Sequence, residues 1–407
     1  MTPYPLDKSG NIIQFSKELD EYGSARFRVS AYDTMLTTYG DVLVPHTNWL
    51  QIIKGGAVVW QGAIIENTKR TKDYIECIAV EPLWYLSKIL VNRTSIDPST
   101  GTSDNIYRIF GVNAAGTSYM GTDLTMKAAV TSIINETIST LQSNSAAHTL
   151  SSMTLGTVQN PNYPPNITSG DNPPKSLTGP WYFGNGTNAP MLQFDFHNIL
   201  YILHQFGVYT YSDFYIDNSL VFSFVQFKGN NLSASVNFTW SQGGQGNTPA
   251  NIVNYNIPRL GQRQINNLVG IATDINGNVL NYPQSDQASI ASYGYLQGVA
   301  AYSDVKDQAT LNARIQAELP LISVPDDTAI SVTQSEKGYP LGTFDVGDIV
   351  TINIQNKGVS FNSQRRIVGF TVLVNGTGRE MTTIQTNKLQ PFQLALANGT
   401  GSTSATT

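Results

Sequence analysis

The sequence predicts a β-rich α+β fold in which two small β-barrels or sandwiches flank one or more α/β domains and a polar insertion. Strand patterns, which alternate apolar and polar side chains, are dense in the first ~90 residues and again towards the C-terminus. Apolar residues at helical spacing occur between these two regions. A stretch rich in Ser, Thr, Asn, Gly and Pro follows the N-terminal strands.

The N-terminal strands show the clearest alternation. In GSARFRVSAYD, Phe27 and Val29 share one face with Ala31, as in a half-buried strand. NWLQIIKGGAVVWQGAIIEN predicts a hairpin, because Gly55 and Gly56 can both adopt the positive φ that a tight turn needs. YIECIAV then predicts a third strand.

The polar insertion contains the helix-breaking segments PNYPPN and DNPPKS. One helix is predicted within it, in DLTMKAAVTSIINETISTLQ, where Asp123 is a candidate N-cap.

The middle of the chain combines helices and strands. DFHNILYILHQFG predicts a helix that ends at Gly207, and SDVKDQATLNARIQAEL predicts a helix that stops at Pro320, with Asp304 and Asp307 near its N-terminus. VYTYSDFYIDNSLVFSFVQF predicts two strands around an Asp217-Asn218 turn, and NLVGIATDINGNVLNYP predicts a hairpin.

The C-terminal segment LGTFDVGDIVTINI looks like a strand launched by a tight turn. Gly342, Asp345, Gly347 and Asp348 are turn residues, and 349–354 alternates as a strand should. Two further strands follow. Their order and connecting lengths are similar to those at the N-terminus, which predicts an internal repeat, although unrelated β-meanders also look alike.

These patterns predict five segments. They are a first β-barrel at 1–93, the insertion with one helix at 94–190, an α/β middle region at 191–325, a second β-barrel at 326–390 and a flexible tail at 391–407.

Composition excludes several classes of protein. Charged residues make up 13% of the chain and its net charge is -5, so a sequence-independent nucleic-acid binder is not indicated. A surface of neutral polar groups suits an assembly protein that buries much of its exterior, but a habit of the source genome would give the same composition. The single cysteine excludes an intrachain disulfide, and neither a signal peptide nor a membrane span is visible.

No motif predicts an enzyme, a metal site or a cofactor. His197 and His204 lie seven apart on one predicted helix, a spacing that suits packing better than metal ligation. DINGNV lacks the ligand spacing of a calcium loop, and Asp326-Asp327 would point to opposite faces of a strand.

The tryptophans allow two interpretations. Trp49, Trp60 and Trp84 fall within strands or apolar runs and are expected in a core. Trp181 and Tyr182, at the end of the insertion, could belong to a core or could stack on sugars.

Four stretches, taken in order, carry a resemblance that spans about residues 20 to 390. They are WLQIIKGGAVVWQGAIIEN, then FHNILYILHQFGVY before LVFSFVQF, then INNLVGIATDINGNV before ASIASYGYLQGV, and finally FDVGDIVTINI with QRRIVGFTVLVNGTGREMTTIQTN. The chain resembles the hub, or tail-tip, proteins of bacteriophage tails, which include baseplate-hub proteins and minor tail proteins. The long insertion departs from the compact pattern of this family.

The resemblance implies a structural virion protein made in the host cytoplasm. Such a protein forms a homotrimeric hub whose two tube-like β-barrels per chain present six similar units to a sixfold tail tube. The implied partners are a tail-tube or distal-tail ring, a tape-measure protein and tail fibre or spike proteins, with DNA only passing through the channel. The alternative is a receptor- or glycan-binding tail protein that acts through 94–190. No cofactor is implied.

Five positions are expected to fix the two barrels as turn or close-approach residues. They are Gly62, Gly347, Asp348, Arg366 and Gly369.

Overall fold

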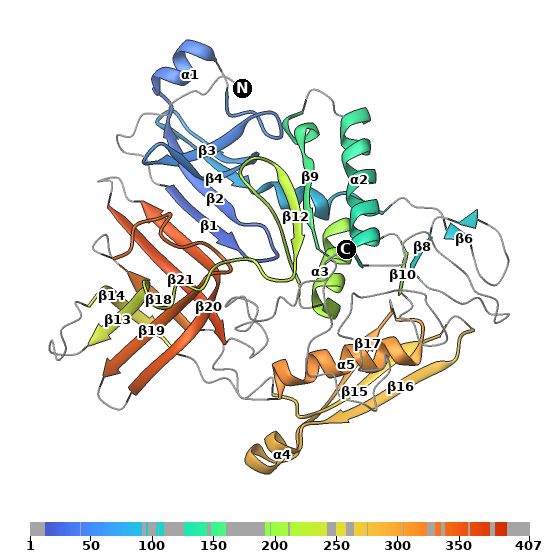
Figure 1. Ribbon diagram of the computed structural model, residues 1–407. Coiled ribbons are helices and arrows are strands. Elements are labelled where there is room, and N and C mark those ends of the chain that lie inside the picture. The colour runs from blue at the N-terminus through green and yellow to red at the C-terminus, as the bar shows by residue number, and fades with distance from the viewer. Residues whose placement is uncertain are drawn as a thin grey trace, which may run out of the picture.

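The structure is a computed structural model with a β-rich α+β fold (Figure 1), as predicted. It describes residues 13–40, 42–91, 95–96, 103–104, 106–109, 126–144, 148–159, 192–195, 197–210, 212–241, 250–257, 264–274, 276–303, 305–323, 330–334, 338–356, 359–374 and 379–388.

One eleven-stranded sheet combines both ends of the chain. We call its first part the N-terminal unit, in which the short helix α1 (Thr34–Tyr39) connects the second and third strands. The strands of the N-terminal unit are β1 (Ile13–Glu18), β2 (Ser24–Ser30), β3 (Trp49–Lys54), β4 (Ala57–Arg70) and β5 (Tyr74–Val80).

We call the second part the C-terminal unit. Two of its strands, β13 and β14, come from the segment expected to form the α/β middle region. The strands of the C-terminal unit are β13 (Asn237–Ser241), β14 (Ile252–Asn256), β18 (Ile330–Gln334), β19 (Ile349–Asn356), β20 (Val359–Val374) and β21 (Glu380–Lys388).

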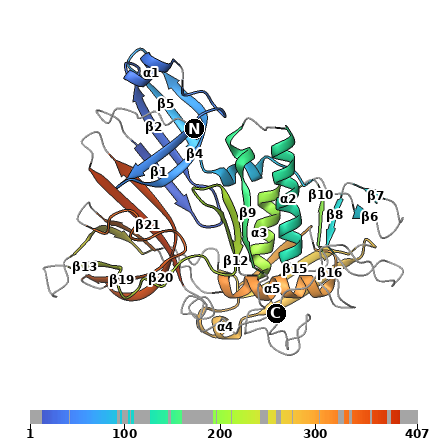
Figure 2. The same cartoon turned by 45° about the horizontal axis from the view of Figure 1, so that its top comes forward.

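The two regions predicted as small β-barrels or sandwiches form one continuous sheet in the described residues. β1 pairs with β2 on one edge and with β20 on the other, so hydrogen bonding runs without a break from one unit to the next (Figure 2). The sheet order is β14-β18-β21-β20-β1-β2-β5-β4-β3, with β19 on β20 and β13 on β19, and no pairing among these strands closes a barrel.

The two units nevertheless share one strand plan. The order β1-β2-β5-β4-β3 in the N-terminal unit matches β14-β18-β21-β20-β19 in the C-terminal unit, and every pairing is antiparallel. A buried row crosses three strands in each unit. The rows are Ile64, Ala79 and Ala25 in one unit and Ile367, Thr386 and Ile330 in the other.

The long strand of each unit is also bulged at the same place. β4 places one extra residue, Ile65, immediately after Ile64, and β20 places one extra residue, Val368, immediately after Ile367. A bulge bends a strand and increases its twist, so a shared bulge is specific evidence of a repeated plan. The internal repeat predicted from the sequence is therefore present in the strand topology.

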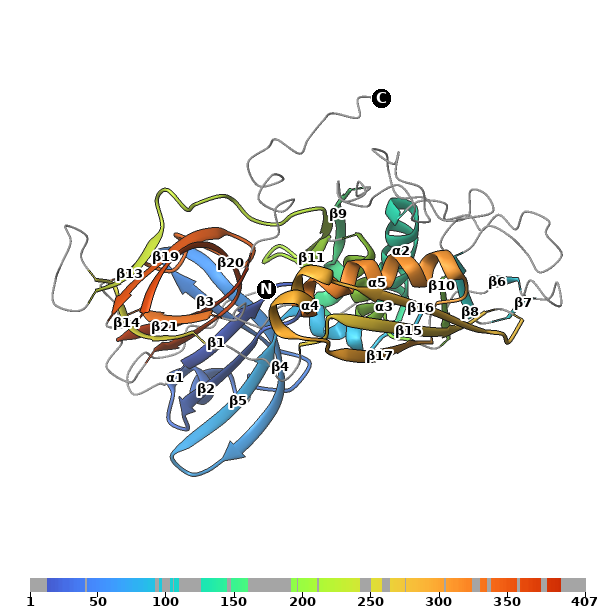
Figure 3. The same ribbon diagram turned by 90° about the horizontal axis from the view of Figure 1, so that it is seen from below.

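A single hydrophobic core lies beneath both units. Trp60 and Phe238 are fully buried in it, and burial along β19 alternates over much of the strand as the sequence predicts. The sheet is curved (Figure 3), and its alternating strands present one apolar face to this core.

The middle region packs helices against a three-stranded sheet with the order β11-β12-β9 around a second core. Two short strand pairs, β6 with β7 and β8 with β10, lie nearby. The elements are η1 (Pro82–Ser87), β6 (Ser95–Ile96), β7 (Ser103–Asp104), β8 (Ile106–Ile109), α2 (Met126–Asn144), η2 (Thr149–Ser152), β9 (Thr154–Val158), β10 (Leu192–Asp195), α3 (Ile199–Thr210), β11 (Asp213–Ile216) and β12 (Val221–Val225).

A further sheet, ordered β16-β15-β17, is covered on one face by α5 (Figure 1). Its elements are β15 (Asn267–Thr273), β16 (Val279–Ser285), α4 (Gln287–Tyr293), β17 (Gln297–Tyr302) and α5 (Gln308–Ile322). None of the helices in the described ranges is long and apolar enough to span a membrane.

The sequence-based helix boundaries are partly wrong. α3 continues through Gly207 to Thr210, and the glycine is instead needed because a Cβ there would lie 2.9 Å from the carbonyl oxygen of Ser212. Pro320 lies in the last turn of α5, where its ring removes one hydrogen bond without ending the helix. Asp307 does cap α5, by accepting a hydrogen bond from the backbone of Thr310.

The predicted β11–β12 and β15–β16 hairpins are both confirmed. The candidate cap Asp123 and Asp304 lie outside the described residues.

Candidate functional site

Three of the five positions expected to fix the barrels meet at one place, between the C-terminal unit and the middle region. Arg366 of β20 is 5% exposed. Its guanidinium donates to both carboxylate oxygens of Asp213 in β11, with Nη1 3.1 Å from Oδ1. It also donates to the carbonyl oxygens of Gly347 at 3.1 Å and Lys228 at 2.9 Å. A planar guanidinium can make all these contacts at once, so one side chain joins three segments.

The N-terminal unit reaches the same place through Asp20, in the turn after β1. Its Oδ1 accepts a hydrogen bond from the backbone N–H of Phe214 at 2.8 Å. Burial raises the pKa of Asp20 well above its usual value, and the neighbouring Asp213 raises it further. We call this meeting point of the three parts the junction.

Asp348 holds the turn that leads into β19. Its two carboxylate oxygens accept hydrogen bonds from the backbone N–H groups of Asn230 and Asp345, both at 2.7 Å. Burial is the largest influence on this carboxyl and raises its pKa. The side chain thus ties the C-terminal unit to the segment that follows β12.

Two glycines allow the turn before β19 to pass close to the backbone of the segment that follows β12. Gly347 has φ +97° and Gly229 has φ +107°. A Cβ on Gly347 would lie 2.4 Å from the carbonyl oxygen of Lys228, and a Cβ on Gly229 would lie 2.3 Å from that of Gly347. Both positions therefore require glycine for conformation and for space.

A second copy of this turn precedes β3. Asn48 Oδ1 accepts a hydrogen bond from the backbone of Val44, much as Asp348 accepts one from Asp345. Each turn then makes the same two backbone hydrogen bonds to the long strand of its unit. They are His46 N to Ile64 O at 2.6 Å and Ile64 N to Asn48 O at 3.0 Å, and Gly347 N to Ile367 O at 2.8 Å and Ile367 N to Asp348 O at 2.9 Å.

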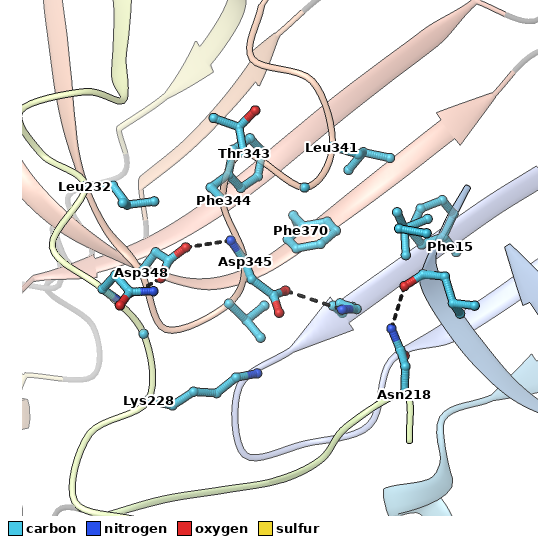
Figure 4. A pocket seen from close by; sticks show the side chains of 18 residues that line it. Phe15, Asn218, Lys228, Leu232, Leu341, Thr343, Phe344, Asp345, Asp348 and Phe370 are labelled. Atoms are coloured by element: carbon cyan, nitrogen blue, oxygen red, sulfur yellow. Dashed lines mark hydrogen bonds and ion pairs between the residues drawn. The ribbon is translucent and has the colours of Figure 1, made fainter. Parts of the chain in front are cut away.

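A cavity of about 530 Å³ opens beside the junction, between β1, the start of β4 and the turn before β19 (Figure 4). Lys17 pairs with Asp345 at 3.4 Å across it, and Asn218 donates to the carbonyl oxygen of Val58 at 2.7 Å. Three aromatic side chains contribute to its lining, Phe15, Phe344 and Phe370. The contacts around the cavity join β1, the β3–β4 hairpin and the turn before β19.

The two other expected positions lie within the units. Gly62 is a close-approach residue, since a Cβ there would lie 2.2 Å from the carbonyl oxygen of Val80. Gly369 follows the bulge in β20, and a Cβ there would lie 3.2 Å from the carbonyl oxygen of Lys17. The second contact is much less severe. The structure therefore brings three of the five positions together and leaves Gly62 and Gly369 apart from them.

Sequence reasoning missed the partners of Arg366. Asp213 stands 153 positions from Arg366 in sequence, and neither residue lies in a spaced motif. Lys228 and Gly229 contribute backbone atoms, which no side-chain pattern reveals. Only the fold brings them together.

The aromatic and histidine expectations have mixed outcomes. Trp60 is fully buried as expected, whereas Trp49 and Trp84 are only partly buried. Trp181 and Tyr182 lie outside the described residues.

His197 precedes α3 and stacks on Tyr201, with ring centroids 4.5 Å apart, so the two histidines do not share a helix as predicted. His204 pairs with Glu21 at 3.3 Å, and burial lowers the pKa of this imidazole. Within the described ranges, no group of three or more His, Cys, Asp or Glu side chains could hold a metal ion.

Comparison with known proteins gives a match in structure but not in sequence. No family model matches the chain, and no curated protein matches it. A tail protein from Neisseria meningitidis MC58 matches with a TM-score of 0.57 and 10% identity, over 93% of this chain and 92% of that chain. The 43 kDa tail protein of prophage MuSo2 from Shewanella oneidensis matches with a TM-score of 0.58 and 11% identity, over 94% and 95%. The chain therefore has the fold of phage tail proteins, as its sequence resemblance predicts.

Proposed function

We propose that this chain is a structural protein of a phage tail, which forms a closed homotrimeric hub between the tail tube and the distal tip. The fold shared with two phage tail proteins supports a tail component, and hence a location in the virion.

The internal repeat is the observation that carries the hub. A chain with two units of one strand plan gives a trimer six similar units. Six units are what a threefold ring needs in order to meet a sixfold tube. An isolated binding module has no need of two units that match a sixfold tube. The repeat therefore favours a ring over such a module.

The hub's neighbours would be the tail-tube or distal-tail ring on one side and fibre or spike proteins on the other. The tape-measure protein and DNA would occupy or pass through the channel. The net charge of -5 suits such passage, because clustered cations would hold the phosphates. In this proposal the ring is built by 1–93 and 326–390 together with β13 and β14, and the rest of the chain is peripheral.

The solution mass of the purified chain tests this function. Light scattering at several protein concentrations should give three times the 44.4 kDa chain mass. A permanent ring interface should bury more than about 2,000 Å², so the mass should not fall on dilution. A dimer that persists over the whole range would contradict the proposal.

A further inference from the structure

The two units differ at the strand that ends each strand plan. In the C-terminal unit, β19 pairs with β20 on one side and with β13 on the other, where the pairing is parallel and starts with Asn237 opposite Thr351. β3 is the counterpart of β19 in the N-terminal unit and pairs with β4. Its other side pairs with no strand in the described part of the chain. We call this side of Trp49–Lys54 the β3 edge.

The repeated plan fixes which residues of β3 and β19 correspond. The buried rows of the two units align Ile64 of β4 with Ile367 of β20. Gln51 lies opposite the residue three positions before Ile64. Thr351 lies opposite the residue three positions before Ile367. Gln51 therefore corresponds to Thr351, and the residues that follow these two also correspond.

The backbone of Gln51 points away from β4. Hydrogen-bonded positions alternate along an antiparallel ladder, and those of β3 continue in steps of two from Asn48, whose carbonyl oxygen accepts from Ile64 at 3.0 Å. Gln51 falls between these positions. Its counterpart Thr351 donates its N–H outward, to the carbonyl oxygen of Val236 just before β13, at 3.0 Å. The β3 edge thus offers the donor that β19 uses to hold β13.

The β3 edge also leaves apolar side chains uncovered. Ile352 of β19 is fully buried, and so is Phe238, which lies opposite it in β13. The counterpart of Ile352 is Ile52, which packs against the same core but is only partly buried. The next residue, Ile53, is 58% exposed. A strand added at the β3 edge would therefore bury apolar surface that the free chain leaves open.

The β3 edge has little to prevent such an addition. Edge strands are commonly protected by proline, by charged side chains or by a bulge. β3 has no proline, and its one charged residue, Lys54, ends the strand and pairs with Glu380 at 2.7 Å. The extra residue of the β3–β4 ladder, Val59, lies on β4. The edge is therefore open to pairing.

β13 indicates the chemistry of the strand that fits. Its sequence, NFTWS, alternates polar and apolar side chains and carries no charge. The β13 of a second copy has no free edge, because β19 pairs with one edge and two side chains bind the other. Asn251 donates to the carbonyl oxygen of Asn237 at 3.0 Å and accepts from the N–H of Thr239 at 2.8 Å, and Tyr339 accepts from the N–H of Asn237 at 2.9 Å.

We propose that the β3 edge receives, in parallel, an uncharged extended segment of a separate polypeptide, as β19 receives β13. A backbone carbonyl of that segment accepts from the Gln51 N–H, and one of its apolar side chains covers Ile52. Strand addition of this kind takes its affinity from main-chain hydrogen bonds and its specificity from alternate side chains. The pairing rests on the repeated strand plan and does not depend on the trimer.

Amide hydrogen exchange on the full chain tests the β3 edge with a synthetic peptide. The probe has the sequence of residues 235–241, SVNFTWS. Adding it should slow exchange of the Gln51 N–H by about tenfold or more, because the amide becomes hydrogen-bonded. The matched control peptide carries Phe238→Ser and should slow this exchange far less, since no apolar side chain then covers Ile52.

Two variants of Gln51 test the hydrogen bond itself. Gln51→Pro removes the outward N–H and leaves the β3–β4 ladder intact, whereas Gln51→Val keeps the N–H. Fluorescence anisotropy of the labelled peptide should show binding about tenfold weaker to Gln51→Pro than to Gln51→Val, the effect of one lost hydrogen bond. Equal affinities would overturn the pairing. If Gln51→Pro does not fold, the exchange measurement on the unmodified chain decides alone.

The remaining outcomes identify other occupants. Slow exchange at Gln51 in the dilute chain without peptide would show that the chain covers its own edge. Slow exchange that appears only as the chain concentration rises would show that a second copy fills it. Either result, or no effect of the peptide at saturation, overturns the proposal. None of them bears on the mass measured by light scattering, so the hub is tested separately.

Discussion

Arg366 is the residue through which the C-terminal unit holds the middle region. Its guanidinium is buried against Asp213 and two backbone carbonyl groups, and it lies 4.1 Å from the ring centroid of Phe227. A buried carboxylate that loses its cation keeps the full cost of desolvation. The arrangement therefore depends on both charges together.

Replacing Arg366→Met should lower the free energy of unfolding by about 3–5 kcal/mol, since it leaves the Asp213 carboxylate buried without its guanidinium partner. Urea denaturation followed by circular dichroism measures this. Arg26→Met is the matched control, because Arg26 makes an exposed pair with Glu76, and should change stability by less than about 0.5 kcal/mol. Equal losses in the two variants would contradict the role given to the junction.

Glu81 should make the stability of the fold depend on pH near neutrality. Burial raises the pKa of Glu81 to about 7, although Lys17 and a hydrogen bond from the Gly23 N–H at 2.7 Å oppose the shift. The folded chain thus binds this proton more tightly than the unfolded chain, whose carboxyl keeps its ordinary value of 4.5. The free energy of unfolding should rise as the pH falls through 7, with the gain complete below the unfolded value.

Glu81→Gln should remove this dependence. The wild-type chain should gain about 2 kcal/mol in unfolding free energy between pH 8 and pH 5 from this group. The variant keeps an acceptor for the Gly23 N–H but cannot ionise, so its profile should be flatter over this range. Thermal unfolding at each pH measures the difference. Profiles of equal slope would show that Glu81 does not carry the effect.

Residue roles were only partly predictable from the sequence. Gly347 and Asp348 stand in a turn signature, and Arg366 follows a strand pattern, so all three could be selected. Asp213 and Asp20 could not, because each acts through contacts with segments more than 150 positions away.

At the scale of elements, the turn before β3 and the turn before β19 are the repeated device of this fold. Both turns return two backbone hydrogen bonds to the long strand, and both place a residue at positive φ, His46 at 61° and Gly347 at 97°. The two turns have little sequence in common, since PHTN precedes β3 and DVGD precedes β19. The shared hydrogen bonds show that the two turns correspond, although their sequences differ.

Gly347→Ala should destabilise the turn severely. The new Cβ would meet the carbonyl oxygen of Lys228 at 2.4 Å in addition to the strain of a positive φ. Gly342→Ala is the matched control, because Gly342 has φ +93° with nothing within 4 Å of the added Cβ. We expect a loss of about 1 kcal/mol for Gly342→Ala from backbone strain alone, and at least twice that loss for Gly347→Ala. Thermal denaturation decides, and similar losses would argue against the backbone crossing.

Strands were more predictable than helix ends. Alternation in VGDIVTINI follows directly from a face packed on a core, and β19 forms there. Glycine and proline usually mark the end of a helix, but neither Gly207 nor Pro320 ends one here. Gly207 is needed because a Cβ would clash with the carbonyl oxygen of Ser212, and Pro320 lies in the last turn of α5, where the helix can accommodate a proline. Tertiary contacts therefore decided both helix ends.

At the scale of the whole molecule, the N- and C-terminal units form one sheet because β1 has two partners. Sequence patterns predict where strands form but not which strand edges pair. The repeat could therefore be predicted from the sequence, whereas the continuous sheet could not. The surface also fits assembly, since only 13% of residues are charged and neutral groups cost less to bury in an interface.

Electron-microscopy class averages of the purified oligomer test the central claim most directly. The account predicts a closed ring of three chains, with one layer of six similar lobes around an open channel. The lobes should alternate between N- and C-terminal units. A compact particle without a channel, or a ring whose layer shows only three lobes, would contradict the account.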